Sequence, residues 1–128
     1  MRVFSQYRKA PMFKLLTSMP PQLALAIAII FEVIATSFIP KAEQFTKLVP
    51  SVIIITGYAI AFFLLSVTVK TMPVGIVYAI WSGSGIVLVA TISYFAYGQR
   101  LDLPAIVGIG LIIAGVLVVN LLSNTVSH

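Results

Sequence analysis

Four long apolar runs, separated by a few charged residues, constrain what this chain can fold into. Residues 15–40 contain one charged residue, Glu32, and residues 48–69, 71–99 and 103–127 contain none. Each run reaches the roughly 20 apolar residues that a helix needs to cross a bilayer. The runs are continuous rather than alternating, which indicates helices and not barrel strands. We therefore predict an all-α integral membrane protein with four transmembrane helices, over residues 21–39, 51–69, 74–97 and 104–122.

The composition excludes several other classes of protein. The 128 residues are 9% charged, whereas soluble domains average about 25%, so the chain cannot cover a water-facing surface with charge. It has no cysteine, and its one histidine is His128. Disulfides, thiolate chemistry and histidine-based metal or catalytic sites are therefore excluded, and we expect no metal and no cofactor. The net charge of +5 is scattered between apolar runs, which favours a role in membrane orientation over nucleic-acid binding.

Proline and charged residues mark the ends of the predicted spans. Pro40 and Lys41 end the first, because proline interrupts the helical hydrogen bonds. Asp102 is expected to cap the fourth helix, with Pro104 in its first turn. The first run is longer than a signal peptide's apolar region and contains an acid, so we expect a permanent span. The chain then divides into an N-terminal basic tail (residues 1–20), a transmembrane domain (21–122) and a C-terminal tail (123–128).

Glu32 lies near the middle of the first predicted span and is the acid on which a functional interpretation depends. No other predicted span contains Lys, Arg or His, so this chain offers Glu32 no ion pair inside the membrane. Its side chain must be protonated, reach water, or meet a cation from outside the protein. A carboxyl group in that position can exchange a proton for a cation. The alternative is a protonated glutamate that only donates a hydrogen bond between helices.

Small and aromatic residues at helical spacing predict a cavity beside Glu32. Small residues on its own helix face leave room for a ligand. Aromatic rings on the second and third helices suit a lipophilic cation, because ring faces attract positive charge. Each aromatic residue taken alone could equally be packing. The residues that we expect at the cavity are Ala28, Ile29, Thr36, Tyr58, Phe62, Tyr78, Trp81 and Ser82.

Glycines mark two further features. Gly83 and Gly85 interrupt the third helix just after Trp81, as a hinge or as a site of close helix packing. The fourth helix has small residues that favour association with another helix, and Gly110 and Ala114 form a small-xxx-small pair. The small residues concerned are Gly108, Gly110, Ala114 and Gly115.

Three segments of the chain resemble the small multidrug resistance family. They are FEVIATS around Glu32, MPVGIVYAIWSGSGIVL (residues 72–88) and YGQRLDLPAIVGIGLIIAGVLVVNLLS (residues 97–123). The likeness extends from about residue 22 to the C-terminus without gaps. The sequence Ile-Trp-Ser-Gly (80–83) is similar to the branch that exports quaternary ammonium compounds, whereas the guanidinium-exporting branch more typically has Trp-Thr-Gly.

The resemblance implies a fold, a function and roles for individual residues. It implies an antiparallel homodimer in the bacterial inner membrane that exports lipophilic and quaternary ammonium cations in exchange for protons. Protons and drug would compete for Glu32 of each subunit. Tyr58, Tyr78 and Trp81 match the cavity aromatics of the family, and Phe62 and Thr36 match cavity or gating positions. The family also implies a kink at Gly83 and Gly85, and a dimer contact on the fourth helix at Gly108 and Gly115.

Two positions depart from the family pattern. The family usually has a lysine directly after the first span, where this chain has Pro40, with Lys41 one place later. A tyrosine near the start of that span is replaced by Gln22, which bears on which drugs fit.

Other functions stay open at this point. The chain could export polyamines or other small cations, or be one subunit of a heterodimer in the same family. It could also be a membrane scaffold without transport, in which case Glu32→Gln would leave drug tolerance unchanged. An intramembrane enzyme is disfavoured, because one acid without His or Cys provides no pair of nucleophile and base.

The basic tail bears on orientation in the membrane. Four spans place both termini on one side, with five basic residues there: Arg2, Arg8, Lys9, Lys14 and Lys70. The opposite side has three, namely Lys41, Lys47 and Arg100. If the chain started at Met19, the side of the termini would have one basic residue and the opposite side three, and this would change the positive-inside bias. We expect the residues before Met19 to be dispensable and the chain to insert in both orientations.

Overall fold

The computed structural model describes residues 2–124, and the side chains from residue 5 onward. That part of the chain is helical and contains no strand, which confirms the predicted all-α fold. The helices are α1 (Arg2–Lys9), α2 (Pro11–Thr17), α3 (Pro21–Ser37), α4 (Ile39–Ala42), α5 (Leu48–Thr68), α6 (Val74–Tyr97) and α7 (Leu103–Leu122).

Three of the described helices have the length and composition of membrane spans, and a fourth, α3, is slightly shorter. Helices α5, α6 and α7 have 21, 24 and 20 residues and are apolar enough to cross a bilayer. Helix α3 has 17 residues, which is at the short end of the range for a span, about 17 to 25 residues. It follows α2 through a bend of 99°.

The helix ends differ slightly from the predicted spans. The sequence predicts a second span from Ser51, whereas α5 begins at Leu48. Pro50 is therefore inside the first turn, where its missing N–H leaves no intrahelical hydrogen bond unmade. The sequence predicts a first span that reaches Ile39, but α3 ends at Ser37 and the short α4 starts after Phe38. Asp102 caps α7 as predicted, because its Oδ1 accepts a hydrogen bond of 3.0 Å from the Ala105 N–H.

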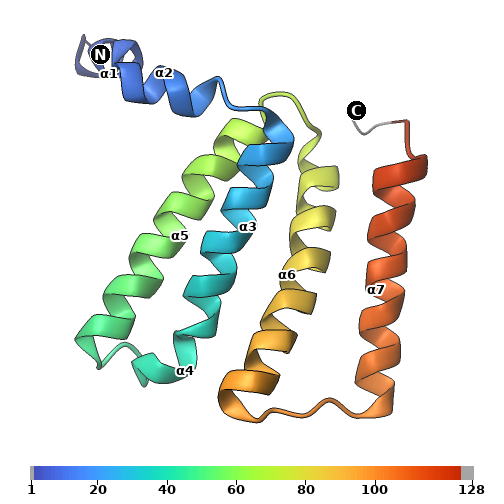
Figure 1. Ribbon diagram of the computed structural model, residues 1–128. Coiled ribbons are helices and arrows are strands. Elements are labelled where there is room, and N and C mark those ends of the chain that lie inside the picture. Colours follow the sequence, from blue (N-terminus) through green and yellow to red (C-terminus); the bar gives the residue numbers. More distant parts are fainter. Residues whose placement is uncertain (1, 125–128) are drawn as a thin grey trace.

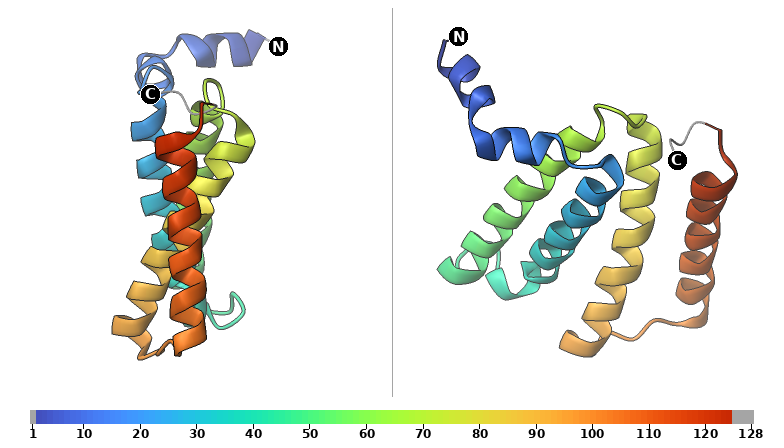
Figure 2. Two further views of the ribbon diagram at one scale, coloured as in Figure 1. Left: turned by 90° about the vertical axis from the view of Figure 1, so that its right-hand side faces the viewer. Right: turned by 45° about the horizontal axis from the view of Figure 1, so that its top comes forward.

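The four long helices stand side by side in the order α5, α3, α6, α7 (Figure 1). Helix α3 thus lies between α5 and α6, although it precedes both in the sequence. Its most extensive packing is with α5, and α7 packs against α6. Figure 2 shows the same arrangement from two further directions, with the N-terminal helices lying across one end. Glu32, on α3, is therefore placed in the middle of the row.

Small residues let α3 and α5 approach closely. A Cβ added at Gly57 of α5 would lie 3.0 Å from Cβ of Ala35 and 3.2 Å from the carbonyl oxygen of Phe31, both on α3. Ala24, Ala28 and Ala61 are fully buried. Close backbone approach of this kind is how membrane helices gain packing energy in the absence of a hydrophobic drive. This contact fixes α3 against α5 and sets which side chains face α6.

The loop end of α6 is fastened to the end of α3. The Tyr97 hydroxyl donates a hydrogen bond of 2.6 Å to the carbonyl oxygen of Ser37. Gly98 ends α6 with a φ of +65°, a left-handed conformation that glycine adopts without the steric cost of a Cβ. In contrast, α7 has no buried residue.

Candidate functional site

A cleft of about 680 Å³ lies beside Glu32 and is lined by α3, α5, α6 and the connection from α6 to α7. Its volume is in the range of small-molecule sites, about 300 to 1,000 Å³. Helix α3 contributes Glu32 and Thr36, which are one turn apart. Most of the residues expected at the cavity line this cleft: Glu32, Thr36, Tyr58, Phe62, Tyr78, Trp81 and Ser82.

A chain of hydrogen bonds holds the Glu32 carboxyl group. Thr36 Oγ1 donates to Glu32 Oε1 over 2.7 Å, and it lies 2.6 Å from the Tyr58 hydroxyl. A threonine hydroxyl has one proton. Because Thr36 gives that proton to Glu32, the Tyr58 hydroxyl is the donor in the second bond. Two hydroxyl groups from two helices thus orient one oxygen of a partly buried carboxylate, and hydrogen bonds to charged acceptors are the stronger kind.

The second carboxyl oxygen of Glu32 faces Gly85 on α6. A Cβ added at position 85 would lie 3.2 Å from Glu32 Oε2. Gly85 itself lines the cleft. The missing side chain therefore leaves room for the carboxyl group between α3 and α6. The sequence predicted Gly85 as a hinge or a packing site, and the carboxyl group is what it packs against.

Four aromatic rings form one connected wall of the cleft. The centroids of Phe62 and Trp81 are 5.5 Å apart, with the rings at 71°. Tyr58 lies 6.4 Å from Phe62, and Tyr78 lies 6.3 Å from Trp81. Trp81 is 9% exposed, whereas Phe62 is 56% and Tyr78 64% exposed. Trp81 thus forms the inner part of the wall, and the other two rings present free surface to a ligand.

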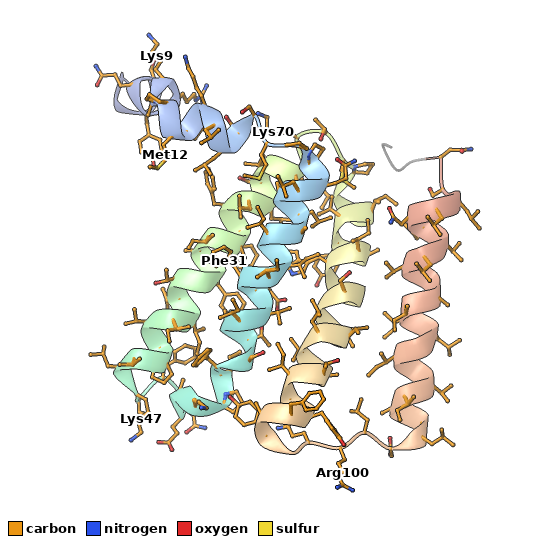
Figure 3. The ribbon with its side chains drawn as sticks, in the orientation of Figure 1. Lys9, Met12, Phe31, Lys47, Lys70 and Arg100 are labelled. Atoms are coloured by element: carbon orange, nitrogen blue, oxygen red, sulfur yellow. The ribbon has the colours of Figure 1, made fainter. Side chains whose placement is uncertain are left out.

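The charge of the cleft is unbalanced. Among the described residues that line it there is one acid, Glu32, and no Lys, Arg or His. The ion pair that the described part of the chain does contain, Glu43 with Lys47 at 3.7 Å, lies in the exposed loop before α5. Lys47 and Arg100 lie at the end of the bundle that is opposite the N-terminal helices (Figure 3). An ionised Glu32 would therefore lack a positive partner from this chain.

Two of the expected cavity residues lie elsewhere. Ala28 is fully buried, and Ile29 belongs to a buried apolar cluster that includes Leu25 and Trp81. Neither lines the cleft. The reason is that both side chains are buried in packing between the helices, so neither reaches the surface of the cleft.

The structure also adds residues that the sequence reading missed. Ile86, Val89, Ala90 and Ser93 continue the lining along α6, and Gln99 and Leu101 close it from the following loop. The α6 residues repeat at intervals of three and four from Ser82, so extending that helix face would have found them. Gln99 and Leu101 lie outside the helices, and no periodic pattern pointed to them.

The predicted hinge and helix-association residues take the following places. Helix α6 continues unbroken through Gly83 and Gly85. A Cβ added at Gly83 would collide with Val116 Cγ2 of α7, so this glycine permits the contact between α6 and α7. A Cβ added at Gly108, Gly110 or Gly115 would meet no atom within 4 Å, and Ala114 is exposed. These four residues of α7 therefore do not mediate close packing within the described chain.

Comparison with known proteins identifies the family. Residues 21–112 match the family described as Small Multidrug Resistance protein. The quaternary ammonium compound-resistance protein QacF of Klebsiella aerogenes is 53% identical over 104 residues, which are 81% of this chain and 94% of QacF. The corresponding protein QacE of Escherichia coli is 52% identical over 106 residues, 83% of this chain and 96% of QacE.

The alignment with a further relative extends over the whole length of that relative. The multidrug transporter EmrE of Escherichia coli K12 is 52% identical over 110 residues, which are 86% of this chain and all of EmrE. The match to the family takes in α3, α5, α6 and the first half of α7, and with them the acid, hydroxyl and aromatic residues of the cleft. The chain is a multi-pass protein of the bacterial inner membrane, and it belongs to the small multidrug resistance family.

Proposed function

We propose that this chain is a multidrug efflux transporter that works as a proton-coupled antiporter for lipophilic and quaternary ammonium cations. Protons and the cation compete for Glu32. The observation that carries the proposal is one carboxyl group in an apolar, aromatic cleft whose described lining contains no basic residue. The names of the relatives, quaternary ammonium compound-resistance proteins and a multidrug transporter, support the substrate class.

The electrostatics of Glu32 explain the coupling. A charge inside a membrane is costly unless it has a partner. The carboxyl group is satisfied in two ways: it takes up a proton, or it keeps its charge and a cationic ligand enters the cleft. Because both occupants neutralise the same group, they exclude each other. Competition for one site then couples the two fluxes without a separate proton pathway.

The hydroxyl chain responds to which occupant is present. With an ionised Glu32, Tyr58 donates to Thr36 and Thr36 donates to the carboxylate. With a protonated Glu32, the carboxyl O–H can donate to Thr36, and Thr36 can then donate to Tyr58. The two protonation states thus favour opposite directions of donation along the same three residues. The protonation state of Glu32 on α3 thus sets the direction of the hydrogen bond that reaches Tyr58 on α5.

The aromatic wall suits the organic groups of a cation that binds near Glu32. A cation within about 6 Å of a ring centroid gains about 2 kcal/mol or more when the site is desolvated. The exposed rings of Phe62 and Tyr78 and the inner ring of Trp81 offer such faces near Glu32. Flat or bulky organic groups can also contact these rings without directional hydrogen bonds. Broad selectivity for lipophilic cations follows from this chemistry.

A second copy of the chain completes the proposed transporter. Helix α7 has no buried residue, and its Gly108, Gly110, Ala114 and Gly115 leave space on the surface for another helix. An antiparallel homodimer would bring two Glu32 residues to one ligand. Two protons exchanged for one monovalent cation would then move one net charge, worth about 2.3 kcal/mol per 100 mV of membrane potential. Exchange of conformation between the two subunits would provide alternating access.

Release of protons on ligand binding tests the proposal. The purified chain, in detergent at weakly buffered pH, is mixed with tetraphenylphosphonium, and the released protons are measured with a pH indicator. The unaltered chain should release protons, and Glu32→Gln should release none. Glu43→Gln is the matched control, because Glu43 is an exposed loop acid paired with Lys47, and it should behave like the unaltered chain. Unchanged release from Glu32→Gln would remove this residue from the mechanism, and binding without any release would indicate a carrier that is not coupled to protons.

A further inference from the structure

The N-terminal helices α1 and α2 lie across the end of the bundle rather than along it. Helix α2 makes an angle of 99° with α3 (Figure 2). Because α3 runs alongside the membrane-spanning helices, α2 is oriented close to the plane of the bilayer. Pro20 lies between the two helices and Pro21 begins α3, and a residue before proline is disfavoured in the helical region. The chain therefore turns here instead of continuing one helix.

The two sides of this segment differ in chemistry. Met12 and Leu15 of α2 are 72% and 71% exposed, and a spacing of three places them on one face of the helix. Met12 points toward the side on which the spanning helices extend, whereas Lys9 points away from them (Figure 3). If α3 crosses the bilayer, Met12 and Leu15 face the surface of the bilayer and Lys9 faces water.

The charge of the segment has one sign. Residues 2–20 include four basic residues and no acid: Arg2, Arg8, Lys9 and Lys14. Arg8, Lys9 and Lys14 are exposed in the structure. Lys70 lies at the same end of the bundle (Figure 3). Basic residues of this density beside an apolar face are typical of helices that bind a membrane with anionic lipids.

Aromatic packing holds the segment at this angle. The ring of Phe13 on α2 lies 5.7 Å from that of Tyr7 and 6.3 Å from that of Phe63 on α5. Phe13 is partly buried, unlike Met12 and Leu15. The apolar residues of α2 thus have two roles: Phe13 docks the helix on α5, and the exposed ones are left without a protein partner among the described residues.

We propose that Arg2–Thr17 is an interfacial membrane anchor. Met12 and Leu15 insert into the boundary between headgroups and acyl chains, and Arg8, Lys9 and Lys14 bind the phosphate groups of anionic phospholipids. The match to the family begins at residue 21, so this lipid contact is a property of the added segment and not of the transport cleft. It does not depend on the proposed exchange of protons for cations.

Site-specific fluorescence in the full chain tests the anchor. The chain has no cysteine, so Met12→Cys and Lys9→Cys each provide a single site for an environment-sensitive dye. Each labelled protein is reconstituted in vesicles of phosphatidylcholine with phosphatidylglycerol, and in vesicles of phosphatidylcholine alone. At position 12 we expect a blue-shifted emission, quenching by shallow spin-labelled lipids and severalfold less quenching by iodide than at position 9. Equal iodide quenching at the two positions would overturn the proposal.

Two further arms separate lipid from other occupants. Protection from iodide at position 12 without quenching by spin-labelled lipids would mean that protein covers this face, and would contradict the proposal. Neutralising Arg8, Lys9 and Lys14 to glutamine in the Met12→Cys chain should raise iodide quenching in the anionic vesicles. If this change has no effect and the two vesicle types give the same result, the recognition of anionic headgroups is wrong. Binding of tetraphenylphosphonium by every labelled variant verifies that the bundle is folded.

Discussion

The Thr36 hydroxyl donates a hydrogen bond of 2.7 Å to Oε1 of Glu32, one turn earlier on α3. The same hydroxyl receives a hydrogen bond from Tyr58 of α5. A hydrogen bond to a charged group contributes about 1.5 to 3 kcal/mol. Thr36 therefore holds the Glu32 carboxyl group in place and connects it to a second helix.

Thr36→Val should weaken the binding of lipophilic cations. Valine keeps the shape of threonine but donates no hydrogen bond, so the Glu32 carboxyl group loses the contact that orients it for a cation. We expect the dissociation constant of tetraphenylphosphonium to rise by roughly tenfold, from the lower end of the energy of such a hydrogen bond. Isothermal titration calorimetry at fixed pH measures this change.

Thr56→Val is the control for this substitution. Thr56 is exposed on α5 and does not line the cleft, so the same chemical change there should leave the affinity unaltered. Equal affinities of the two variants would show that the contact between Thr36 and Glu32 does not contribute to binding.

Gly85→Ala should impair the site through the carboxyl group. The new Cβ would lie 3.2 Å from Glu32 Oε2, which is close enough to shift the carboxylate. Gly75→Ala is matched to it, because Gly75 is on the same helix and an added Cβ there meets no atom within 4 Å. Both changes gain helix propensity, about 1 kcal/mol each, so neither should lower the unfolding temperature strongly. We expect a severalfold loss of tetraphenylphosphonium affinity in Gly85→Ala alone.

Several residues of the cleft could be predicted because the pattern that identifies each of them lies within a single helix. Glu32 stands out as the charge inside a predicted span, and helical spacing alone groups Tyr58 with Phe62 and Tyr78 with Trp81. All five residues line the cleft. The charge-free runs likewise located the long helices, since nothing but a membrane span requires about 20 apolar residues in a row.

What the sequence could not provide is how the helices are rotated against each other. The bond between Thr36 and Tyr58 depends on the close approach of α3 and α5 at Gly57, which no pattern within one helix reveals. Ala28 and Thr36 are each four residues from Glu32, so helical spacing treats them alike. Thr36 lines the cleft, whereas Ala28 is buried.

Trp81→Ala should weaken the binding of aromatic cations by more than about tenfold, because a desolvated contact between a cation and a ring contributes about 2 kcal/mol or more. Trp81 is also buried, and removal of a buried ring costs about 3 to 5 kcal/mol of stability. Trp81→Phe separates the two effects, since it keeps a ring and should lie between the unaltered chain and Trp81→Ala. Phe45→Ala, in the exposed loop after α4, should bind normally. An unchanged dissociation constant in folded Trp81→Ala would assign this residue to packing alone.

Removal of the residues before Met19 should preserve transport and change orientation. The cleft contains no residue from this segment, so uptake of tetraphenylphosphonium into vesicles, driven by a proton gradient, should be unaltered. In the full chain, the side of the termini has Arg2, Arg8, Lys9, Lys14 and Lys70 against Lys41, Lys47 and Arg100 on the other. The shortened chain has Lys70 alone against those three, which removes the excess of basic residues that favours termini inside.

Labelling of single cysteines in cells measures this orientation. With a cysteine at Gln44 in the loop before α5, an impermeant reagent should reach a larger fraction of full chains than of shortened ones, because that loop is outside when the termini are inside. The shortened chain should be labelled in part, since copies in both orientations are needed for an antiparallel dimer. If every shortened chain had the same orientation and transport were intact, then insertion in both directions would not be required, and the subunits of the working transporter would have to be parallel.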